Sequence, residues 1–526
     1  MASKHHKFGF SEKVTKKIVQ VEELMQVIGR YPRTEKIVMC HGTFDLVHPG
    51  HLRHLAFAKS RAGKLVVSLT ADEFVHKANN RPYVPEDLRA LNLAALELVD
   101  FVVIDINPEP IELIKGIQPE YFVKGFEYGD VELMPAKTKA EKEMVESYGG
   151  EIVFSPGDFI LSSSAVIEND PPNIAIEKLM ILMQAENIDF IDLKNSLIGL
   201  ENLSVEIVGD VIVDSLTTTT VIGGHRKTPT PSVKIERVER FVGGAGIVAK
   251  HINAAGVKVI LHSVIGEDEI GKFVINDLAN CGVQFEYLVD RNRPTTHKNA
   301  VISDGYRLIR IDDVNSAGIN SEQLAKITNK LKISNANAVI LSDFRHGIFN
   351  KSTIPAILKS VPNKTLKVAD SQVASRWGNI LDFLNCDLIT PNEQEVRFAL
   401  ADQDTVIRPL GSELMKKSGA KTLMLKLGAR GMLTFRTDEK AGERPAFFAI
   451  DALVRENIID PVGSGDALLA YATIVQLKTN NEVLSSIIGS IAAGLACQKE
   501  GNVTISPDEI LEYLNKLEKM SNLVDS

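Results

Sequence analysis

Two histidines three positions apart, His48 and His51, flank a Pro-Gly pair shortly after an apolar segment, residues 36–40. Nucleotidyl transfer needs a triphosphate held in line with the incoming phosphate. It also needs neutralisation of the charge that develops on the α-phosphate and pyrophosphate. Two imidazoles at a helix start can donate hydrogen bonds there, beside N–H groups that attract anions. Gly50 lets the backbone approach the phosphates. Read alone, the pair also fits surface or metal-binding histidines.

A second phosphate-handling loop, residues 463–466, reads Gly-Ser-Gly-Asp and precedes a predicted helix over residues 467–477. Phosphorylation of an alcohol requires a base near the hydroxyl and positive or dipolar groups around the γ-phosphate. The glycines allow a tight turn whose N–H groups form an anion hole, and Asp466 can accept the hydroxyl proton. An aspartate that merely caps a helix is the structural alternative. Asp460, six residues earlier, favours the catalytic interpretation.

Length, composition and charge bound the class of protein. A chain of 526 residues predicts two or three domains, and 44% apolar with 24% charged residues is typical of globular proteins. The net charge of -9 argues against a general nucleic-acid binder. Four scattered cysteines indicate reduced thiols. Without a long apolar run or a secretory leader, we expect a cytoplasmic protein that binds neither nucleic acid nor membrane.

Strands that alternate with helices predict a parallel sheet in each half of the chain. Apolar positions at helical spacing predict one helix over residues 14–28. Pro171 and Pro172 interrupt the alternation because proline removes a backbone donor and blocks helix continuation. We therefore expect a first α/β domain over residues 1–169, a helical linker over residues 170–200, and a second α/β domain over residues 201–526.

Two segments of the second domain have a different pattern. Interleaved Thr, Val and Lys residues over 217–241 and 298–310 indicate antiparallel strands rather than parallel ones. We expect these strands to form a small sheet, a β lid, that projects from the second domain. The two halves of the chain share an alternation of elements but no clear internal repeat.

The string around the first histidine pair resembles the cytidylyltransferase-like nucleotidyltransferase superfamily. Gly42, Thr43, Phe44 and Asp45, followed by His48-x-Gly50-His51 after a strand, carry this resemblance. It implies a Rossmann-like domain in which His48 and His51 are catalytic and the other five residues bind nucleotide. Read singly, an arginine is an ordinary helix residue and a serine run an N-cap. Further matches imply nucleotide or phosphate binding by Lys77, Arg81, Arg89, Lys124, Ser162, Ser163 and Ser164.

The Asp466 loop resembles the second signature of the ribokinase (PfkB) sugar-kinase family, with Pro461 in place of the usual threonine. The first signature corresponds to the turn at Gly243 and Gly244, where Ile247 replaces an asparagine that usually touches sugar. The resemblance implies a ribokinase-like domain with Asp466 as catalytic base. It implies phosphate binding by Asn392, Glu395, Lys426, Gly428, Gly431, Gly463, Ser464 and Gly465, and it implies that Glu395 also contacts Mg²⁺ indirectly. It implies sugar binding by Asp210, Asp214, Gly243 and Gly244.

Four further segments narrow the resemblance to bifunctional ADP-heptose synthesis enzymes: residues 226–231, 296–298, 308–312 and 341–347. It implies that the second domain phosphorylates C1 of D-glycero-D-manno-heptose 7-phosphate and that a separate phosphatase removes the 7-phosphate. The first domain would then transfer AMP from ATP to heptose 1-phosphate and release pyrophosphate. ATP serves both domains with Mg²⁺, and fixed donors would hold the acceptor's phosphate. We select Arg226, Lys227, Lys298 and Arg310 for that role.

The resemblance leaves two alternatives open, and it has one departure. In those enzymes the kinase comes first, whereas here the order of the domains is reversed. The first alternative is a kinase and cytidylyltransferase, or one using another nucleotide, for a different sugar or polyol phosphate, as Ile247 and Pro461 suggest. The second is a scaffold or nucleotide sensor with one inactive domain, against which intact His48, His51 and Asp466 argue. Relatives also imply that the lid mediates a homodimer.

Overall fold

The computed structural model describes residues 11–75, 82–125, 135–155, 175–224, 231–373, 378–437 and 446–524. The chain forms two compact units, the first Met1–Ile174 with Asn522–Ser526 and the second Ala175–Ser521. Each unit contains its own sheet and its own hydrophobic core. Within the described ranges, no helix is long and apolar enough to cross a membrane.

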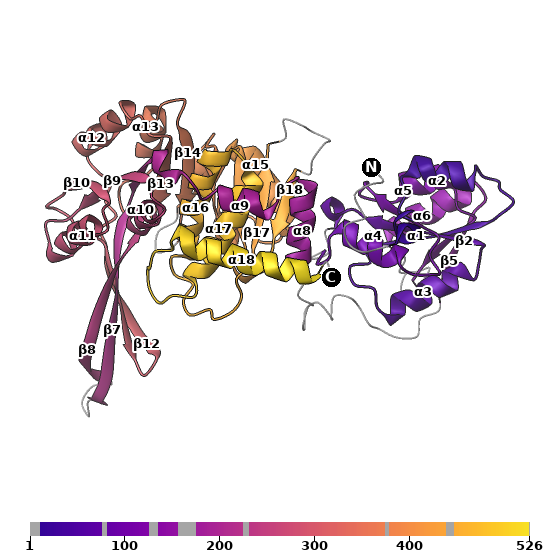
Figure 1. Ribbon diagram of the computed structural model, residues 1–526, viewed down its shortest axis with the longest axis horizontal. Helices are drawn as coiled ribbons and strands as arrows, with labels where there is room; N and C mark the ends of the chain where they lie inside the picture. The colour runs from indigo at the N-terminus through magenta and orange to yellow at the C-terminus, as the bar shows by residue number, and fades with distance from the viewer. Residues whose placement is uncertain are drawn as a thin grey trace. The chain divides into compact units, whose positions relative to one another are not determined.

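A five-stranded parallel sheet forms the centre of the first unit, with strand order β3-β2-β1-β4-β5 (Figure 1). Side chains alternate across it, so that Val38 and Cys40 belong to one core cluster and Ile37 and Met39 to the other. This arrangement confirms the predicted parallel sheet. The elements are α1 (Glu12–Thr15), α2 (Val21–Ile28), β1 (Ile37–Gly42), α3 (Pro49–Lys59), β2 (Lys64–Thr70), η2 (Asp72–Phe74), α4 (Glu86–Ala94), β3 (Phe101–Asp105), α5 (Ile111–Ile117), β4 (Tyr121–Lys124), α6 (Ala136–Ser147) and β5 (Glu151–Phe154).

The single helix predicted over residues 14–28 is wrong. Two helices, α1 and α2, are separated by a segment that pairs with the edge strand β3. The Val19 N–H donates to the Val102 carbonyl at 3.0 Å, and the Val102 N–H donates to the Lys17 carbonyl at 2.8 Å. Because an edge strand has unpaired backbone groups, it can hold this segment extended despite the helical spacing of its apolar residues.

The second unit has a nine-stranded sheet in the order β10-β9-β6-β13-β14-β15-β16-β17-β18, antiparallel only at β16-β17-β18. Ile340 faces one core cluster, and its neighbours Val339 and Leu341 face the other. The elements are α8 (Ala175–Ala185), α9 (Phe190–Asn195), η4 (Leu200–Asn202), β6 (Ser204–Gly209), β7 (Val211–Gly224), β8 (Pro231–Gly244), α10 (Ala245–Ala254), β9 (Lys258–Ile265), α11 (Glu269–Asn280), β10 (Gln284–Val289), β11 (His297–Ser303), β12 (Tyr306–Asp313), α12 (Ser321–Lys332), β13 (Ala338–Asp343), α13 (Thr353–Ser360), β14 (Leu366–Ser371), η5 (Ile380–Asp382), β15 (Leu388–Ile389), α14 (Glu393–Leu400), α15 (Ile407–Ser418), β16 (Thr422–Lys426), η6 (Gly428–Arg430), β17 (Met432–Arg436), β18 (Phe447–Ile450), α16 (Ser464–Thr479), α17 (Glu482–Ala496) and α18 (Pro507–Val524).

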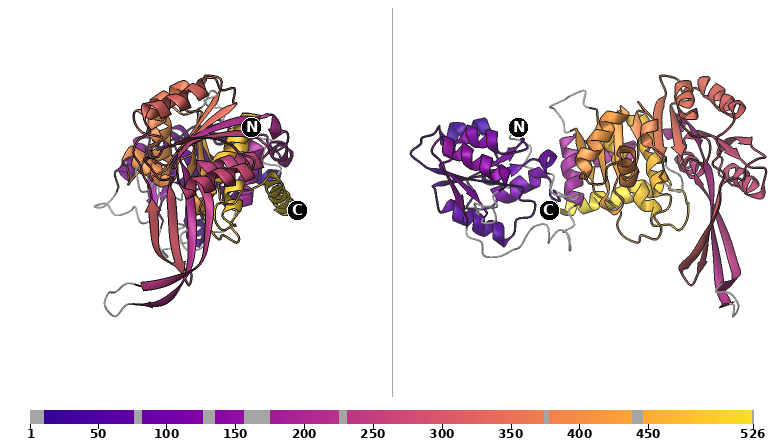
Figure 2. Two further views of the ribbon diagram at one scale, coloured as in Figure 1. Left: turned by 90° about the vertical axis from the view of Figure 1, so that its left-hand side faces the viewer. Right: turned by 180° about the vertical axis from the view of Figure 1, so that it is seen from behind.

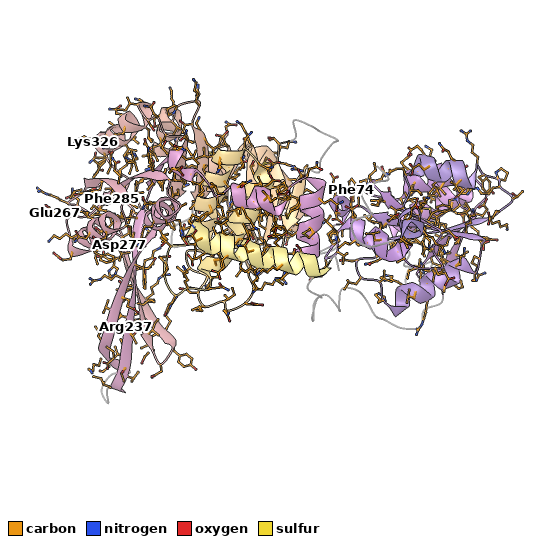
Figure 3. The ribbon with its side chains drawn as sticks, in the orientation of Figure 1. Phe74, Arg237, Glu267, Asp277, Phe285 and Lys326 are labelled. Atoms are coloured by element: carbon orange, nitrogen blue, oxygen red, sulfur yellow. The ribbon has the colours of Figure 1, made fainter. Side chains whose placement is uncertain are left out.

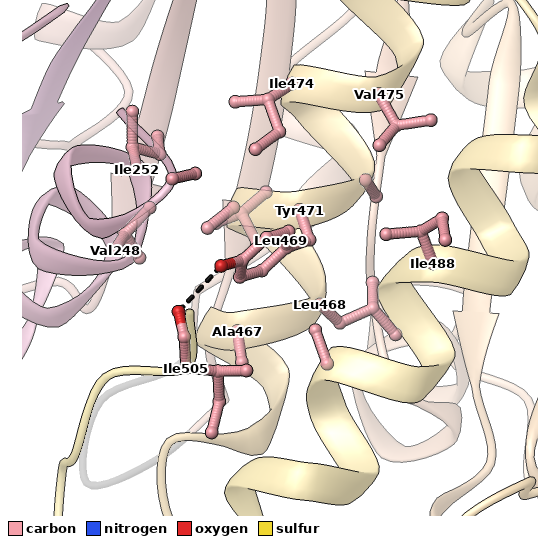
Figure 4. Close-up of a cluster of buried hydrophobic side chains, with 14 of the residues drawn as sticks. Val248, Ile252, Ala467, Leu468, Leu469, Tyr471, Ile474, Val475, Ile488 and Ile505 are labelled. Atoms are coloured by element: carbon pink, nitrogen blue, oxygen red, sulfur yellow. Dashed lines mark hydrogen bonds between the residues drawn. The ribbon is translucent and has the colours of Figure 1, made fainter. Parts of the chain in front are cut away.

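Helix α16 lies in the larger core, between α10 and α17 (Figure 4). Val248 and Ile252 of α10 pack toward it, as does Ile488 of α17. Tyr471 is fully buried, and its hydroxyl donates to the Ile505 carbonyl at 2.6 Å. This bond satisfies a polar group in an apolar environment and ties the loop before α18 to α16.

Four strands form the projecting lid in the order β12-β11-β7-β8 (Figures 1 and 2). The lid confirms the predicted small sheet, and its β7–β8 and β11–β12 pairs are antiparallel as expected. The β11–β7 pair is parallel, so the lid is a mixed sheet. Strand β7 begins after β6 and is followed by its antiparallel partner β8. Strand β11 begins after β10 and is followed by its antiparallel partner β12.

Residues 175–200, which we expected in a linker, pack within the second unit. Leu179 and Met183 of α8 and Phe190 and Leu193 of α9 are buried in its larger core. Asp189 caps α9 by accepting the Asp192 N–H at 2.8 Å. Helices α8 and α9 are therefore part of the second unit.

Candidate functional site

His48 and His51 stack at the start of α3, with ring centroids 3.9 Å apart. His48 is the N-cap, and its Nδ1 accepts a hydrogen bond from the Gly50 N–H at 3.1 Å. An accepting Nδ1 carries no proton, so the proton of the neutral ring is assigned to Nε2, which can donate to an anion. Burial lowers the pKa of His48, which favours this neutral form.

His51 has the opposite arrangement of ring nitrogens. Its Nδ1 lies 3.1 Å from the Leu46 carbonyl oxygen, which can only accept, so Nδ1 is the protonated nitrogen. Its Nε2 can therefore take up a proton and then donate it. Because two adjacent positive rings repel, the stacked pair favours one charge at a time. The two rings together offer a donor and a proton-exchanging group to a phosphate.

Buried hydrogen bonds hold the segment before the histidines. Phe44 is buried with a φ of 47°, and its ring lies 3.2 Å from where a Cβ on Gly42 would be. Asp45 is also buried, and it accepts the N–H groups of Tyr83 and Val84 at 2.8 and 2.7 Å. The carboxylate of Asp45 thus fixes the loop that contains Thr43 and leads to Gly50 in α3, and its direct contact with nucleotide stays a prediction.

Arg89 is fully buried at the base of this loop. Its guanidinium donates to the Thr43, Thr70 and Val84 carbonyls at 2.5, 2.8 and 2.9 Å, and to Asp72 at 2.6 Å. All three guanidinium nitrogens are therefore used by groups of the protein. This geometry favours support of the phosphate loop over direct phosphate contact, which stays a prediction.

Lys124, at the end of β4, pairs with a residue that sequence reasoning missed. Its Nζ lies 2.7 Å from Oε2 of Glu141, a fully buried residue of α6. Each charge compensates the other in a buried position, so Glu141 fixes Lys124 at the sheet edge where ligands bind in open α/β folds. Glu141 has no motif around it that could have identified it. Lys77, Arg81, Ser162, Ser163 and Ser164 lie outside the described residues.

Asp466 lies in the first turn of α16, after Gly463, which has a φ of 77°. Its Oδ1 is buried and has no hydrogen-bond partner among the described residues. Burial and then Asp370 raise the pKa of Asp466 to about 8, although Lys426 lowers it. An unpaired carboxyl group that titrates near neutral pH at a helix start is suited to accept a hydroxyl proton.

The loop before Asp466 places Lys426 beside the helix start. A Cβ on Gly465 would lie 3.3 Å from the Lys426 Nζ. The Ser464 hydroxyl donates to the Pro461 carbonyl at 2.8 Å, so the turn closes with proline at this position. The ammonium group and the first N–H groups of α16 thus face the same space, as an anion site requires.

Two carboxylates surround Lys426. Its Nζ lies 2.9 Å from Oδ1 of Asp370, a buried residue at the end of β14 that was not among the predicted site residues. Burial opposes the charge of Lys426, but Asp370 and Glu395 raise its pKa overall. Burial also raises the pKa of Glu395 to about 7, while Lys426 lowers it. The cluster therefore carries exchangeable protons near neutral pH.

Asn392 and Glu395 form a capping box at the start of α14. The Asn392 side chain accepts the Glu395 N–H at 2.9 Å, and the Glu395 carboxylate accepts the Asn392 N–H at 2.7 Å. Helix capping alone accounts for this pair, while the buried carboxylate near Lys426 is compatible with the predicted phosphate and metal role. Within the described residues, no group of three or more His, Cys, Asp or Glu side chains could hold a metal ion.

The two predicted sugar-binding aspartates have different environments. Asp210 is buried and accepts the N–H groups of Phe344, His346 and Ile348 at 3.2, 3.1 and 3.4 Å. Asp210 therefore fastens the loop after β13. Asp214 lies at the base of the lid with partial exposure, and it remains accessible for a ligand. Burial raises the pKa of Asp214, while Lys298 lowers it.

The lid register brings Lys298 and Arg310 to the face that carries Asp214. Lys298 pairs with Asp214 on β7 and with Asp312 on β12. Arg310 lies two positions from Asp312 on the same strand face, and its guanidinium donates to Asp312 at 2.8 Å. Two cations and two carboxylates thus meet on one face, where a phosphate and hydroxyl groups could both bind. Arg226 and Lys227 lie outside the described residues.

The turn into α10 needs its glycines. Gly244 has a φ of 60°, and a Cβ there would lie 2.5 Å from the Asp210 carbonyl oxygen. A Cβ on Gly243 would lie 2.7 Å from Oδ2 of Asp214 and 2.6 Å from Nδ2 of Asn502, a residue that was not predicted. Ile247 is fully buried in α10. The turn therefore approaches Asp214 through backbone alone.

Gly428 and Gly431 close the short turn after β16. The Gly431 N–H donates to the Gly428 carbonyl at 2.9 Å, and the Leu427 N–H donates to the Gly431 carbonyl at 2.8 Å. Both glycines have positive φ, 61° and 88°. The turn follows directly on Lys426, so these glycines set where β16 ends, and their contact with nucleotide stays a prediction.

Comparison with known proteins gives relatives for both units. A cytidylyltransferase-like family model matches residues 39–169. "Bifunctional protein HldE" of Nitratiruptor sp. is 28% identical over 321 residues, and that of Desulfatibacillum aliphaticivorans is 27% identical over 341 residues. These matches cover 60% and 63% of this chain, and 65% and 66% of the relatives. The chain thus spans just under two thirds of the length of these relatives.

A solved structure shows the same fold as the larger unit. Phosphofructokinase-2 from Escherichia coli, in complex with substrates and products, gives a TM-score of 0.50 at 17% identity over 60% of this chain and 99% of that chain. The likeness confirms the ribokinase-like α/β fold with parallel strands. The family model for pfkB family carbohydrate kinases matches residues 202–509, more than half of the chain. The chain therefore belongs to the pfkB family of carbohydrate kinases.

Proposed function

We propose that the chain is a bifunctional sugar-activating enzyme. The second unit transfers the γ-phosphate of ATP to the C1 hydroxyl of D-glycero-D-manno-heptose 7-phosphate. A separate phosphatase then removes the 7-phosphate. The first unit joins heptose 1-phosphate to AMP from ATP, giving ADP-heptose and pyrophosphate. The presence of both an adenylyl-transfer loop at His48 and a phosphoryl-transfer loop at Asp466, in a chain related to proteins named bifunctional, supports this proposal.

The unpaired carboxyl of Asp466 carries the kinase proposal. In its ionised form Asp466 removes the proton of the acceptor hydroxyl as the oxygen attacks the γ-phosphorus. ADP leaves from the opposite side. Lys426 and the first N–H groups of α16 stabilise the charge on the transferred phosphoryl group. Asp214 accepts hydrogen bonds from the acceptor's hydroxyls, and Lys298 and Arg310 hold its phosphate.

The stacked imidazoles carry the adenylyl-transfer proposal. The Nε2–H of His48 donates to the α-phosphate as the sugar phosphate oxygen attacks it. His51 donates from its protonated Nε2 to the leaving pyrophosphate. Lys124 and the N–H groups at the start of α3 add positive charge at the same sheet edge. No covalent enzyme intermediate is needed, because positioning and neutralisation suffice for this transfer.

The carboxylates around Lys426 fit a site that a cation completes. Asp466 has an unpartnered buried oxygen, and burial, with Asp370 beside it, raises the pKa of Glu395 although Lys426 lowers it. Mg²⁺ usually enters such sites with nucleotide phosphates and several waters, with few protein ligands. Bound Mg²⁺ would neutralise the β- and γ-phosphates. Glu395 and Asp370 would hold Mg²⁺ through water molecules.

Mass spectrometry of reaction products tests the proposal. Purified full-length protein is incubated with ATP and Mg²⁺, once with heptose 7-phosphate and once with heptose 1-phosphate. We expect a heptose bisphosphate in the first reaction and ADP-heptose in the second. Asp466→Asn should abolish only the first product, and His48→Ala or His51→Ala only the second. Wild-type protein that forms neither product would refute the proposed substrates.

A different acceptor or nucleotide is the second candidate. Ile247 is buried where relatives in the family present a sugar-contacting asparagine, so one polar contact to the sugar is missing here. The same assay with CTP and GTP, and with a panel of hexose, pentose and polyol phosphates, separates the candidates. Higher kcat/KM for any other pair of substrates than for ATP with the heptose phosphates would favour this second candidate. Absence of turnover with every pair would favour a scaffold.

The lid also supports a homodimer. Paired residues of its four strands share a face, and Ile309, Val301, Thr217 and Val238 lie side by side in register. Ile309 and Val238 are 57% and 44% exposed. The opposite face includes several charged residues. It carries Arg237 of the projecting β8 (Figure 3), which pairs with Glu239, as well as Asp214 and Lys298.

An exposed apolar face on one side of a sheet is a common site of association. We therefore infer that the apolar lid faces of two copies pack together, while the charged faces remain with the acceptor sites. Sedimentation velocity should show a dimer for the wild type. Ile309→Lys should give a monomer, and Arg237→Ala, on the charged face, should leave the dimer unchanged. A wild-type monomer at micromolar concentration would contradict this inference.

A further inference from the structure

Asn502 connects the acceptor side of the kinase site with its anion loop. The residue lies in the loop before α18 and is 6% exposed. Its Nδ2 donates to Oδ2 of Asp214 at 3.0 Å. Its Oδ1 is buried and has no hydrogen-bond partner among the described residues. One amide therefore touches the carboxylate at the base of the lid and leaves its other end inside the site.

Glycines surround this amide because no side chain fits there. A Cβ on Gly243 would lie 2.6 Å from Nδ2, and a Cβ on Gly463 would lie 2.6 Å from Oδ1. Gly243 precedes α10, and Gly463 caps α16. The amide thus fills the space between the turn beside Asp214 and the loop that precedes Asp466. Its size sets the separation of these two segments.

The orientation of the amide follows from charge. A carboxylate only accepts hydrogen bonds, so the NH₂ group must face Asp214 and the oxygen must face Gly463. Burial raises the pKa of Asp214, while the nearby positive charge of Lys298 and the hydrogen bond from Asn502 lower it. Lys298, Arg310, Asp312 and Asp466 are charged groups near Asp214. Asn502 is the neutral donor among them, and it fixes the orientation of the carboxylate without adding charge.

We propose that Asn502 is a positioning residue of the kinase: it holds the Asp214 carboxylate ready for the acceptor's hydroxyls and fixes its distance from the anion loop at Gly463. The inference rests on the proposed kinase function. It implies that Asn502 acts on acceptor binding far more than on ATP binding. A residue that only packed the loop would affect stability, and its substitution would change the KM for the acceptor and the KM for ATP by the same factor.

Asn502→Asp tests this role at constant shape. It replaces the donor with an oxygen and brings two carboxylates together at about 3 Å, where their mutual repulsion raises the pKa of one of them. We expect the KM for heptose 7-phosphate to rise at least tenfold at pH 8, with the KM for ATP within twofold of wild type. The ratio of variant to wild-type KM should shrink at pH 6, because the carboxylate pair then shares a proton and regains a donor.

Asn253→Asp is the matched control. The Nδ2 of Asn253, at the C-terminal end of α10, donates to the Cys281 carbonyl at 2.6 Å. The same chemical change there should leave both KM values unchanged. Asn502→Ala, which removes the donor without adding charge, should raise the acceptor KM by about tenfold at both pH values. Equal acceptor KM values for wild type and both Asn502 variants would overturn the proposal.

An error in the proposed substrate can be distinguished from an error in the role proposed for Asn502. If wild type does not turn over heptose 7-phosphate, the comparison is made with the sugar phosphate that it does phosphorylate. If it phosphorylates none of the panel, the proposed function fails on wild type alone. Crystal structures of wild type and Asn502→Asp then decide the inference. A displaced Asp214 carboxylate supports it, and an unmoved one overturns it.

Discussion

Raising the pH from 7 to 9 should increase the kinase kcat/KM about tenfold, because Asp466 must be ionised to accept a proton. Burial and Asp370 raise its pKa to about 8, from an ordinary value of 3.8. With that pKa, roughly a tenth of the carboxyl groups are ionised at pH 7. The rate should therefore level off above pH 9 and fall about tenfold for each unit below pH 7.

Lys426→Met should move the acid limb of the pH profile, the range in which kcat/KM falls as the pH falls, to higher pH. Lys426 lies beside Gly465 and lowers the pKa of Asp466. Two unit charges about 5 Å apart at an effective dielectric constant of 20 interact by about 3 kcal/mol. Because one pKa unit corresponds to about 1.4 kcal/mol, the limb should rise by roughly two units. Lys426→Arg keeps the charge, so its limb should stay near pH 8.

The assay follows ADP release between pH 6 and 10 with both substrates below their KM values, since kcat/KM reports groups of the free enzyme. Pyrophosphate release by the first unit, measured in the same preparations, controls for folding and for general effects of pH. Loss of a phosphate contact would lower the plateau at every pH without moving the limb. A wild-type limb near pH 4, or a limb that Lys426→Met leaves in place, would refute the role assigned to Asp466.

Three other substitutions separate catalytic from structural roles. His48→Ala should lower pyrophosphate formation by about 10²–10³ and spare ADP formation, because one phosphate donor is lost; loss of both activities would contradict independent sites. Arg89→Met should lower the free energy of unfolding of the first unit by about 3 kcal/mol or more, because buried carbonyls lose their donor; unchanged melting with a raised KM for ATP would instead indicate phosphate contact. Asp210→Ala should destabilise the second unit by about 2–4 kcal/mol in thermal denaturation, because it leaves loop N–H groups unpaired, and an unchanged melting temperature with a raised acceptor KM would restore its predicted sugar role.

The parallel sheets and the lid could be predicted because their signals are local. Buried strands such as β1 are short apolar runs, and the lid strands alternate polar with apolar residues. The prediction failed where tertiary contact overrode a local signal. Residues 17–19 lie in a helical pattern, but the open edge of β3 holds them extended. Periodicity cannot report which strand of a sheet will have a free edge.

Site residues with a sequence motif were predictable, and their supporting partners were not. Gly463 and Asp466 share one loop, so their spacing carries the signal. Glu141, Asp370 and Asn502 contact the site from distant segments that contain no motif. A buried carboxylate or amide becomes recognisable only when the structure shows which charge it faces. The same limit applies to fully buried Arg89, whose carbonyl partners no sequence pattern reports.

The reversed order of the two units has no chemical cost. Every described residue of the His48 site lies between Gly42 and Glu141, and every described residue of the Asp466 site lies between Asp210 and Asn502. Each set is thus contained in one compact unit with its own sheet and core. Because the geometry of a site is fixed by the elements that carry it, exchanging the order of two such units changes the connection and leaves both sites intact. The same independence is why single substitutions should remove one activity and spare the other.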